Sequence, residues 1–337
     1  MAKVSIIGAG SWGIALATVL HDNGHEVTIW SVMDQEIEML KRDHEHKDKL
    51  PGVILSDDMV FTSDVKEAAL DKDLFVMAVP SPYTRSTSHL FAPYIEDGKI
   101  VVNVAKGIEE KTLDTLTDII SEEIPQAVVA VLSGPSHAEE VSRGIPTTCV
   151  VGAKKKETAE LIQSYFMNER FRVYTSPDVL GIELGGALKN VVALAAGMAD
   201  GLGYGDNTKA ALITRGISEI ARLGVAMGGK IETFAGLTGI GDLIVTCASM
   251  HSRNRRAGIL MGQGKTMQEA MDEVKMVVEG VYSAKAAMGL AKKYNVEVPI
   301  IEKVNEILFN DGKASDAMRE LMLRDKKSES DSFTWNE

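Results

Sequence analysis

The sequence predicts an α/β protein in which a doubly wound parallel sheet is followed by an all-helical C-terminal domain. In the first half of the chain, short apolar runs alternate with helix-prone segments, which is the pattern of a parallel sheet with crossover helices. From Val179 to about Arg324, helical periodicity is almost continuous and little strand signal remains. We therefore expect domains at residues 1–178 and 179–325, with a loose Ser- and acid-rich tail at 326–337.

A glycine-rich turn separates the first predicted strand from the first predicted helix. The apolar run 4–7 is followed by Gly-Ala-Gly-Ser-Trp-Gly at 8–13, so strand, G-x-G-x-x-G and helix stand in the order of the Rossmann-type dinucleotide fingerprint. Gly8 permits the tight turn, Gly10 lets a pyrophosphate approach the backbone, and Gly13 lets the helix pack closely. A glycine turn without a ligand, or a secretory signal, explains the stretch less well, because three glycines interrupt it and a second strand follows.

The second predicted strand, Val27–Trp30, bears on the choice of cofactor. Sites specific for NAD usually place Asp or Glu at the end of this strand to bind the ribose 2′-hydroxyl. Here that position holds Ser31 and Val32, with Asp34 a little later. A neutral serine tolerates a 2′-phosphate and no adjacent arginine demands one, so NAD(H) and NADP(H) both remain possible.

Three further apolar runs end in residues suited to a ligand site. Their positions are 74–79, 100–104 and 127–132, followed by Pro80, by Ala105-Lys106-Gly107 and by Ser133-Gly134-Pro135-Ser136. Ligands of doubly wound sheets lie outside the carboxyl ends of the strands. We therefore expect Pro80, Lys106 and Ser136 to gather around one crevice.

Other segments complete the α/β pattern. Strands are expected at 147–151 and 171–175, and helices at 34–49, 64–70 and 157–167. The histidines His44 and His46 fall within the charged segment 34–49 and are expected to be solvated.

Composition limits the classes of function. The chain has 337 residues, of which 45% are hydrophobic and 25% charged, as in ordinary globular proteins. With 36 Lys and Arg against 48 Asp and Glu the net charge is −12, which argues against nucleic acid as a partner. A phosphate ligand would therefore need a local cluster of cations.

Cysteine content and hydropathy bear on cellular location and on metal binding. The cysteines Cys149 and Cys247 have no metal-type spacing and are typical of a reducing cytoplasm, so we expect a cytoplasmic protein and no metal site. No uninterrupted apolar run of about 18 residues is present, so we expect no membrane span.

The start of the helical region holds a candidate catalytic lysine. Gly185 and Gly186 interrupt an apolar helix at a cost of about 1 kcal/mol each, which the close approach of another segment would explain. Lys189 follows one turn later, bordering the apolar run 191–196. It is either a snorkelling side chain or a functional ammonium in a cleft, and its place at the domain junction, where pockets form, favours the second.

Two further groups could carry chemistry. Asp242, in the turn 239–243, is either a helix N-cap or a site carboxylate. The cluster Ser-Arg-Asn-Arg-Arg at 252–256 is either a solvated loop or a phosphate site, because guanidinium, hydroxyl and amide groups all donate to phosphate oxygens. His137 has no partner in the sequence, and we expect it to pack on the cofactor side rather than act in catalysis.

The motifs together resemble the bacterial NAD(P)-dependent glycerol-3-phosphate dehydrogenases, in the order of that family and over residues 4 to about 325. The matching segments are Gly8–Gly13, Ala105–Gly107, Ser133–Ser136, Ala187–Asn190, Gly239–Leu243 and Ser252–Asn254. The resemblance implies reduction of dihydroxyacetone phosphate to sn-glycerol 3-phosphate, the backbone precursor of phospholipids, with NADH or NADPH. We also expect a homo-oligomer, specifically a dimer, with a small phosphorylated substrate.

The resemblance also assigns roles to individual residues. Lys189 is implied as the catalytic acid/base and as a substrate contact. The implied cofactor contacts, with Ser31 and Val32 near the adenosine ribose, are Gly8, Gly10, Ser11, Trp12, Gly13, Ser31, Val32, Lys106, Ala138, Arg253 and Glu279. The other implied substrate contacts are Lys106, Gly134, Ser136, Asp242, Ser252, Arg253 and Asn254.

The chemistry of carbonyl reduction agrees with this assignment. Hydride delivery to a carbonyl leaves an alkoxide, which needs a nearby positive charge and then a proton, and a lysine ammonium supplies both. We expect burial to lower the pKa of Lys189 toward neutrality, while Asp242 limits the decrease.

Two alternatives are considered, one within enzymes and one from another class of function. A β-hydroxyacid dehydrogenase shares the general architecture and a catalytic lysine, but its asparagine one helical turn after the lysine is replaced here by Ala193, and the cluster 252–256 argues against it. A non-catalytic dinucleotide sensor would have no need of Lys189, Asp242 and Arg253 together.

Overall fold

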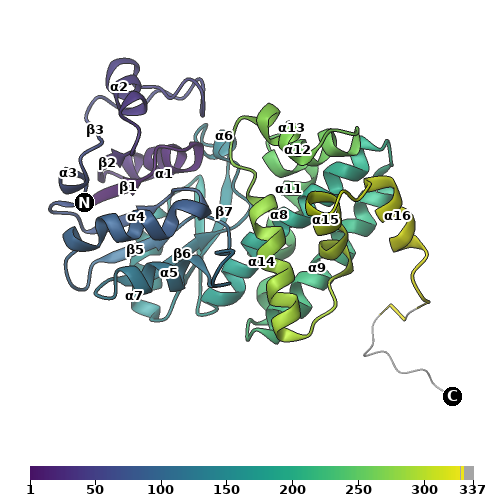
Figure 1. Cartoon of the computed structure of the whole chain (residues 1–337). Helices are drawn as coiled ribbons and strands as arrows, with labels where there is room; N and C mark the ends of the chain where they lie inside the picture. Colours follow the sequence, from purple (N-terminus) through teal and green to yellow (C-terminus); the bar gives the residue numbers. More distant parts are fainter. Residues whose placement is uncertain (327, 330–337) are drawn as a thin grey trace.

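The computed structural model describes residues 1–326 and 328–329, which form a sheet-containing part and a helical part lying side by side (Figure 1). The strands are β1 (Lys3–Ile7), β2 (Glu26–Trp30), β3 (Val60–Thr62), β4 (Leu74–Met77), β5 (Ile100–Asn103), β6 (Val128–Ser133), β7 (Thr147–Ala153) and β8 (Phe171–Ser176). The predicted tail at 326–337 lies outside the described residues except for 326, 328 and 329.

The helices fall into two groups along the chain. Those among the strands are α1 (Ser11–Asp22), α2 (Asp34–Asp43), α3 (Val65–Ala69), α4 (Thr84–Phe91), α5 (Leu116–Glu123), α6 (Ala138–Val141) and α7 (Lys156–Phe166), with short 3₁₀ turns at Ser81–Tyr83 and Ala92–Tyr94. Those after the sheet are α8 (Val179–Gly201), α9 (Asp206–Ala226), α10 (Ile231–Phe234), α11 (Asp242–Ala248), α12 (Arg253–Gly262), α13 (Met267–Val274), α14 (Glu279–Tyr294), α15 (Pro299–Phe309) and α16 (Ala314–Met322).

Within the described residues the eight strands form one sheet in the order β3-β2-β1-β4-β5-β6-β7-β8. The strands β1 to β6 are parallel, which confirms the predicted Rossmann-type sheet followed by helices. The parallel order does not extend to the far edge, where β7 runs antiparallel to β6 and β8 is parallel to β7. The connection from β6 to β7 contains only the four-residue helix α6, so the chain re-enters the sheet from the end at which it left.

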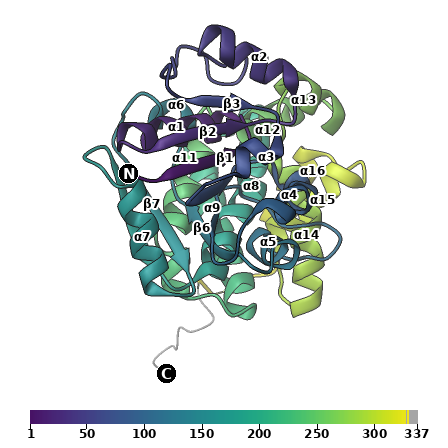
Figure 2. The same ribbon diagram turned by 90° about the vertical axis from the view of Figure 1, so that its left-hand side faces the viewer.

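Buried side chains alternate between two layers, one on each face of the sheet. Ile6 and Val76 belong to a core that includes apolar residues of α1 and α7. Ile7 and Phe75 belong to a second core that includes residues of α3, α4 and α5. Figure 2 shows α7 on one side of the sheet and α4 and α5 on the other. Because both faces are covered, the carboxyl ends of the strands are the part of the sheet left for a ligand.

Helix α8 is the centre of the helical part and is buried along nearly all of its 23 residues. By length and composition it could cross a membrane, as could Ile231–Ala248, but 89% of the apolar window in α8 is buried inside the protein. Burial on every side is typical of the core helix of a globular domain. The second segment is only 39% buried and is interrupted by a π-helical turn at Leu237–Gly241. No clear membrane span therefore emerges from the described residues.

Glycines let α12 lie directly against α8. A Cβ at Gly197 would lie 2.1 Å from the carbonyl oxygen of Arg255, and one at Gly258 would lie 2.2 Å from that of Leu194. This close approach fixes the N-terminus of α12, and with it the predicted phosphate cluster, beside the helix that carries Lys189.

The segment after β2 differs from its prediction. Helix α2 ends at Asp43, not near Lys49, because His44 adopts a left-handed conformation with φ 50°. The chain then folds back over α2, so that His46 is only 2% exposed and its Nε2 lies 3.5 Å from Glu36 Oε1. The expectation of a solvated His46 was therefore wrong, because the fold-back depends on contacts that no local sequence pattern indicates.

Candidate active site

The glycine turn has the geometry that a dinucleotide requires. Gly8 has φ +121° and its N–H donates to the carbonyl of Trp30 at 2.9 Å, while a Cβ at Gly13 would lie 2.2 Å from the carbonyl oxygen of Gly8. Gly10 is the N-cap of α1, no side chain caps the helix there, and a Cβ at this position would meet nothing within 4 Å. The N–H groups of the first turn are therefore directed at open space, where a pyrophosphate would accept from them.

Three other predicted cofactor contacts lie beside this turn or near it. Ser11 begins α1 and its hydroxyl donates to the carbonyl of Lys49 at 2.7 Å. Trp12 packs against the core, and its Nε1 is buried with no hydrogen-bond partner among the described residues. Ala138 is buried at the start of α6, which packs against α1.

The predicted catalytic lysine lies in a buried polar cluster. The Nζ of Lys189 is 3.0 Å from Asp242 Oδ1 and donates to Thr246 Oγ1 at 2.6 Å. Thr246 in turn donates to the backbone carbonyl of Asp242 at 2.6 Å. Lys189 and Asp242 are 5% and 1% exposed. With two of its three N–H groups directed at these partners, the ammonium retains one donor for a ligand.

The π-helical turn explains why Asp242 faces the lysine. Asp242 is the first residue of α11, and its carboxylate does not cap that helix but bonds two lysines. A Cβ at Gly185 would lie 2.6 Å from the carbonyl oxygen of Thr238, so the π turn packs directly on α8. This is the close approach that the glycines in the helix predicted.

Lys106 completes the cluster from the sheet side. Its Nζ donates to Asp242 Oδ2 at 2.7 Å and to the carbonyl of Gly134 at 2.9 Å. Ser136 donates to the same carbonyl at 3.0 Å. The structure therefore brings the ends of β5 and β6 together with α8 and α11. We expected Lys106 and Ser136 to lie close together, because each follows a strand end.

Burial controls the charges in this cluster. It lowers the pKa of Lys189 to about 8, with Lys106 acting in the same direction and Asp242 opposing the change. Burial alone would raise the pKa of Asp242, but the two lysines outweigh it and hold that pKa below its usual value. The cluster therefore pairs an ionised carboxylate with a lysine that can lose its proton near neutral pH, which agrees with the expected direction.

His137 adjoins the same cluster. Its pKa is lowered by burial and by the positive charges of Lys189 and Lys106, and its Nε2 is buried without a partner in the described part of the chain. It forms the N-cap position of α6. A neutral imidazole with a free nitrogen beside two lysines can donate or accept one hydrogen bond from a ligand.

The start of α12 divides the predicted phosphate cluster into structural and free groups. Ser252 caps the helix by accepting from the N–H of Arg255 at 3.2 Å. Asn254 donates to Asn190 Oδ1 and accepts from the N–H of Gly280, both at 2.9 Å. These side chains therefore hold α12 to α8 and α14.

Arg253 is a partly buried member of the cluster whose side chain is free. Its guanidinium is partly buried and makes no hydrogen bond or ion pair with another described residue, and burial lowers its pKa although Glu279 and Glu139 act in the opposite sense. A partly buried guanidinium without a partner is stabilised by a ligand anion that compensates its charge.

Glu279, at the start of α14, joins the helical part to the sheet. Its carboxylate accepts from the N–H of Ser81 at 3.0 Å and from the Ser81 hydroxyl. Burial raises the pKa of Glu279, although these bonds to Ser81 and the charge of Arg253 oppose the rise. Ser81 follows β4 and lies against Gly107, so this contact closes the crevice between the strand ends and α14.

Ser31 and Val32 lie in a separate group at the end of β2. Ser31 is buried and donates to Glu36 Oε2 at 2.7 Å, whereas Val32 is 73% exposed. Lys49 forms an ion pair with the other oxygen of Glu36.

Several residues of these groups were not predicted from the sequence. They are Thr246, Ser81, Glu36 and Lys49. Thr246 could have been found, since it lies four residues after Asp242 and hence on the same helix face. The contacts of Lys49 with Glu36 and of Ser81 with Glu279 join segments that folding brings together.

A Rossmann sheet with an open anion-binding turn, joined to helices that hold a buried lysine, defines an NAD(P)-linked dehydrogenase. The chain belongs to the NAD-dependent glycerol-3-phosphate dehydrogenase family: models of the N-terminus and the C-terminus of this dehydrogenase match residues 3–159 and 178–319.

Individual relatives agree with this family. The chain is 65% identical over 335 residues to a glycerol-3-phosphate dehydrogenase (NAD(P)+) of Agathobacter rectalis, covering 99% of this chain and 100% of that protein. A protein of the same name from Fusobacterium nucleatum is 64% identical with the same coverage. Among solved structures, glycerol-3-phosphate dehydrogenase from Coxiella burnetii superimposes with a TM-score of 0.93 at 34% identity, covering 96% of this chain and 99% of that chain.

Proposed function

We propose that this chain reduces dihydroxyacetone phosphate to sn-glycerol 3-phosphate with NADH or NADPH and thereby supplies phospholipid synthesis. The observation that carries the proposal is the buried cluster of Lys189, Asp242 and Lys106 at the carboxyl ends of the strands. It combines a proton donor with positive charge at the place where a Rossmann domain presents its cofactor.

Lys189 acts as the acid in this proposal. When bound, a reduced nicotinamide would supply the hydride that adds to the C2 carbonyl carbon of the substrate. Lys189 Nζ donates a proton to the carbonyl oxygen as negative charge develops there, so that hydride and proton together make the alcohol. Asp242 and Thr246 hold the ammonium in place, and in the reverse direction the neutral amine removes the hydroxyl proton.

The substrate phosphate is recognised by cations. The charges of Lys106, Arg253 and Lys189 less that of Asp242 leave two positive charges, which matches a phosphate dianion. Gly134 and Ser136 border the substrate at the end of β6. Ser252 and Asn254 position Arg253 through their own hydrogen bonds.

The proposal also assigns a role to each part of the chain. Residues 1–178 form the cofactor domain and residues 179–325 the substrate and catalytic domain, and the enzyme works as a dimer in the cytoplasm. The glycine turn Gly8–Gly13, together with Ala138 and Glu279, would hold the cofactor, and Ser31 and Val32 would lie near its adenosine ribose. Light scattering of the purified chain tests the dimer.

Decay of nicotinamide absorbance tests the reaction directly. Purified protein is mixed with NADH or NADPH and either dihydroxyacetone phosphate or unphosphorylated dihydroxyacetone. We expect rapid oxidation with the phosphate ester and at least about a hundredfold lower kcat/KM without the phosphate, because charge-assisted contacts of about 1.5–3 kcal/mol each are lost. No oxidation with either cofactor would overturn the proposal, and a panel of β-hydroxyacids would then identify the alternative.

A further inference from the structure

The end of β2 contains a buried acid that the sequence did not place there. In Rossmann domains an acidic residue near this point binds the ribose 2′-hydroxyl and so favours NAD over NADP. The strand itself ends in the neutral Ser31, but Glu36 reaches the same position from α2 and is 7% exposed. The inference drawn below from Ser31 and Glu36 rests on the proposed use of a nicotinamide cofactor.

Glu36 determines what Ser31 can offer to a ligand. The Ser31 hydroxyl donates its only proton to Glu36 Oε2 at 2.7 Å and accepts from the N–H of Met33 at 3.2 Å. A hydroxyl arranged in this way can only accept a further hydrogen bond. It suits a ribose hydroxyl, which donates, and does not suit a phosphate, which needs donors.

Glu36 also holds a cation beside this position. Lys49 Nζ forms an ion pair with Glu36 Oε1, and His46 Nε2 lies 3.5 Å from the same oxygen. The backbone carbonyl of Lys49 accepts from the hydroxyl of Ser11, the first residue of α1. Lys49 therefore bridges the glycine turn and the end of β2, between which an adenosine ribose lies.

The charges of this group balance without a ligand. Burial alone would raise the pKa of Glu36, but the nearby His46 imidazole and the hydrogen bonds from Lys49 and Ser31 lower it to about 2, so the carboxylate is ionised at neutral pH. The ammonium of Lys49 offsets this charge. Two neighbouring cations, Arg42 and Lys47, are themselves paired with Asp43. A 2′-phosphate would thus add negative charge beside an ionised carboxylate whose cation is already engaged.

We propose that Glu36 is the residue that determines cofactor choice, favouring the 2′-hydroxyl of NAD(H) over the 2′-phosphate of NADP(H) by fixing the Ser31 proton and the Lys49 ammonium. The selecting acid is thus supplied by helix α2 and not by the strand end. Neutralising it frees the hydroxyl to donate and the ammonium to bind phosphate.

Fluorescence titration of the full-length protein with NADH and with NADPH, without substrate, tests the proposal. The measured quantity is the ratio of the two Kd values, which a general loss of folding or of pyrophosphate binding does not move. We expect the unchanged protein to bind NADH more tightly, and Glu36→Gln to shift the ratio toward NADPH by about tenfold or more. Glu38→Gln, an exposed position on the same helix, is the matched control and should leave the ratio unchanged.

A second variant gives a result of opposite sign. Lys49→Met leaves Glu36 ionised without its cation, so binding of NADPH should weaken further relative to NADH, by several-fold. This variant decides the question if Glu36→Gln does not fold. A preference of the unchanged protein for NADPH, or a ratio in both variants within twofold of that of Glu38→Gln, would overturn the proposal. Because the titration needs no turnover, absence of dihydroxyacetone phosphate reduction would contradict the proposed function and still leave the ratio to decide the role of Glu36.

Discussion

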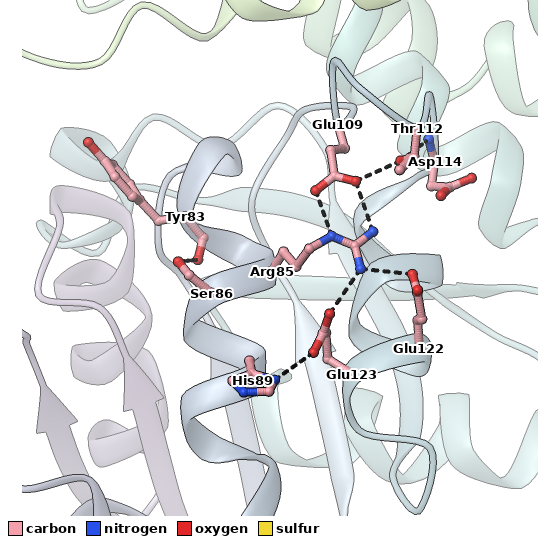
Figure 3. Close-up of polar contacts among 9 residues, drawn as sticks. All are labelled: Tyr83, Arg85, Ser86, His89, Glu109, Thr112, Asp114, Glu122 and Glu123. Carbon is pink, nitrogen blue, oxygen red and sulfur yellow. Dashed lines mark hydrogen bonds and ion pairs between the residues drawn. The ribbon is translucent and has the colours of Figure 1, made fainter.

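Two groups of charged side chains bring distant parts of this chain together, and they differ mainly in burial. The first is the cluster of Lys189, Asp242 and Lys106, whose side chains are 6%, 2% and 17% exposed. The second, shown in Figure 3, is centred on Arg85 of α4, whose guanidinium is 28% exposed. We call this second group the Arg85 network.

The Arg85 network contains more ionic contacts than the buried cluster. Arg85 makes two bonds of 2.8 Å to Glu109 and further bonds of 2.8 and 2.9 Å to Glu122 and Glu123. His89 contacts Glu123 at 3.0 Å. These contacts raise the pKa of Arg85, first through Glu109, and so keep it charged. The network links α4 and α5 to the segment after Lys106.

The comparison shows that burial, more than the number of contacts, makes a charged group reactive. Each ion pair of Arg85 is partly exposed, so water screens it and reduces the free energy that it contributes. Lys189 has fewer partners, yet desolvation brings its pKa near neutrality. The following predictions test this difference, from the largest expected effect to the smallest.

Removal of the buried lysine should have the largest effect. Lys189→Ala should lower kcat for dihydroxyacetone phosphate by about 10³-fold or more, because both the proton donor and the positive charge at the carbonyl oxygen are lost. Cofactor binding should be retained, since the glycine turn is untouched. Steady-state kinetics measure the first and fluorescence titration the second. Lys285→Ala, at a half-exposed lysine on α14, serves as control, and near-normal kcat in Lys189→Ala would refute its role.

Removal of the carboxylate between the lysines should have the second-largest effect, on both stability and kcat. Asp242→Asn leaves two ammonium groups near each other without their buried counter-charge, which should cost about 3–5 kcal/mol of unfolding free energy at pH 7. Urea unfolding measures this loss, and kcat should fall as Lys189 loses its orientation. A change below about 1 kcal/mol would show that the cluster is more solvated than its burial indicates.

The pH dependence should report the pKa of Lys189. Reduction needs the ammonium, so kcat/KM for dihydroxyacetone phosphate should fall as pH rises through about 8, whereas oxidation of glycerol 3-phosphate should increase over the same range. Because Asp242 raises the pKa of Lys189, the break should move to lower pH in Asp242→Asn. If kcat/KM in both directions is independent of pH from 6 to about 10, Lys189 is not the proton-transfer group.

Disruption of the Arg85 network should have the smallest effect. Arg85→Ala should lower the unfolding free energy by about 1–2 kcal/mol, because the pairs are partly exposed and water screens them, and the loss should shrink in about 1 M salt. Thermal melts at low and high salt measure the difference. Arg319→Ala, at a 71% exposed arginine, is the control. A loss comparable to that of Asp242→Asn would contradict the comparison.

The sequence by itself was sufficient for the fold class, the dinucleotide turn and the residues with the strongest local signals. Gly8, Gly10 and Gly13 stand between a strand and a helix, and Lys189 interrupts an apolar helix beside two glycines. Such signals are local, because turn geometry, helical periodicity and the exceptional position of a charge in an apolar run are all encoded within a few residues.

Only the tertiary structure decided the partners of these residues. Segments separated in the sequence are joined by the bonds of Asn254 to Asn190 and Gly280 and by the contact of Glu279 with Ser81. The antiparallel pairing of β7 with β6 is likewise a tertiary contact. The fold-back that places His46 and Lys49 on Glu36 has the same character. A hydrogen bond or an ion pair depends on where packing brings two groups and on how much water it removes, and neither quantity is contained in the residues on one side of the contact.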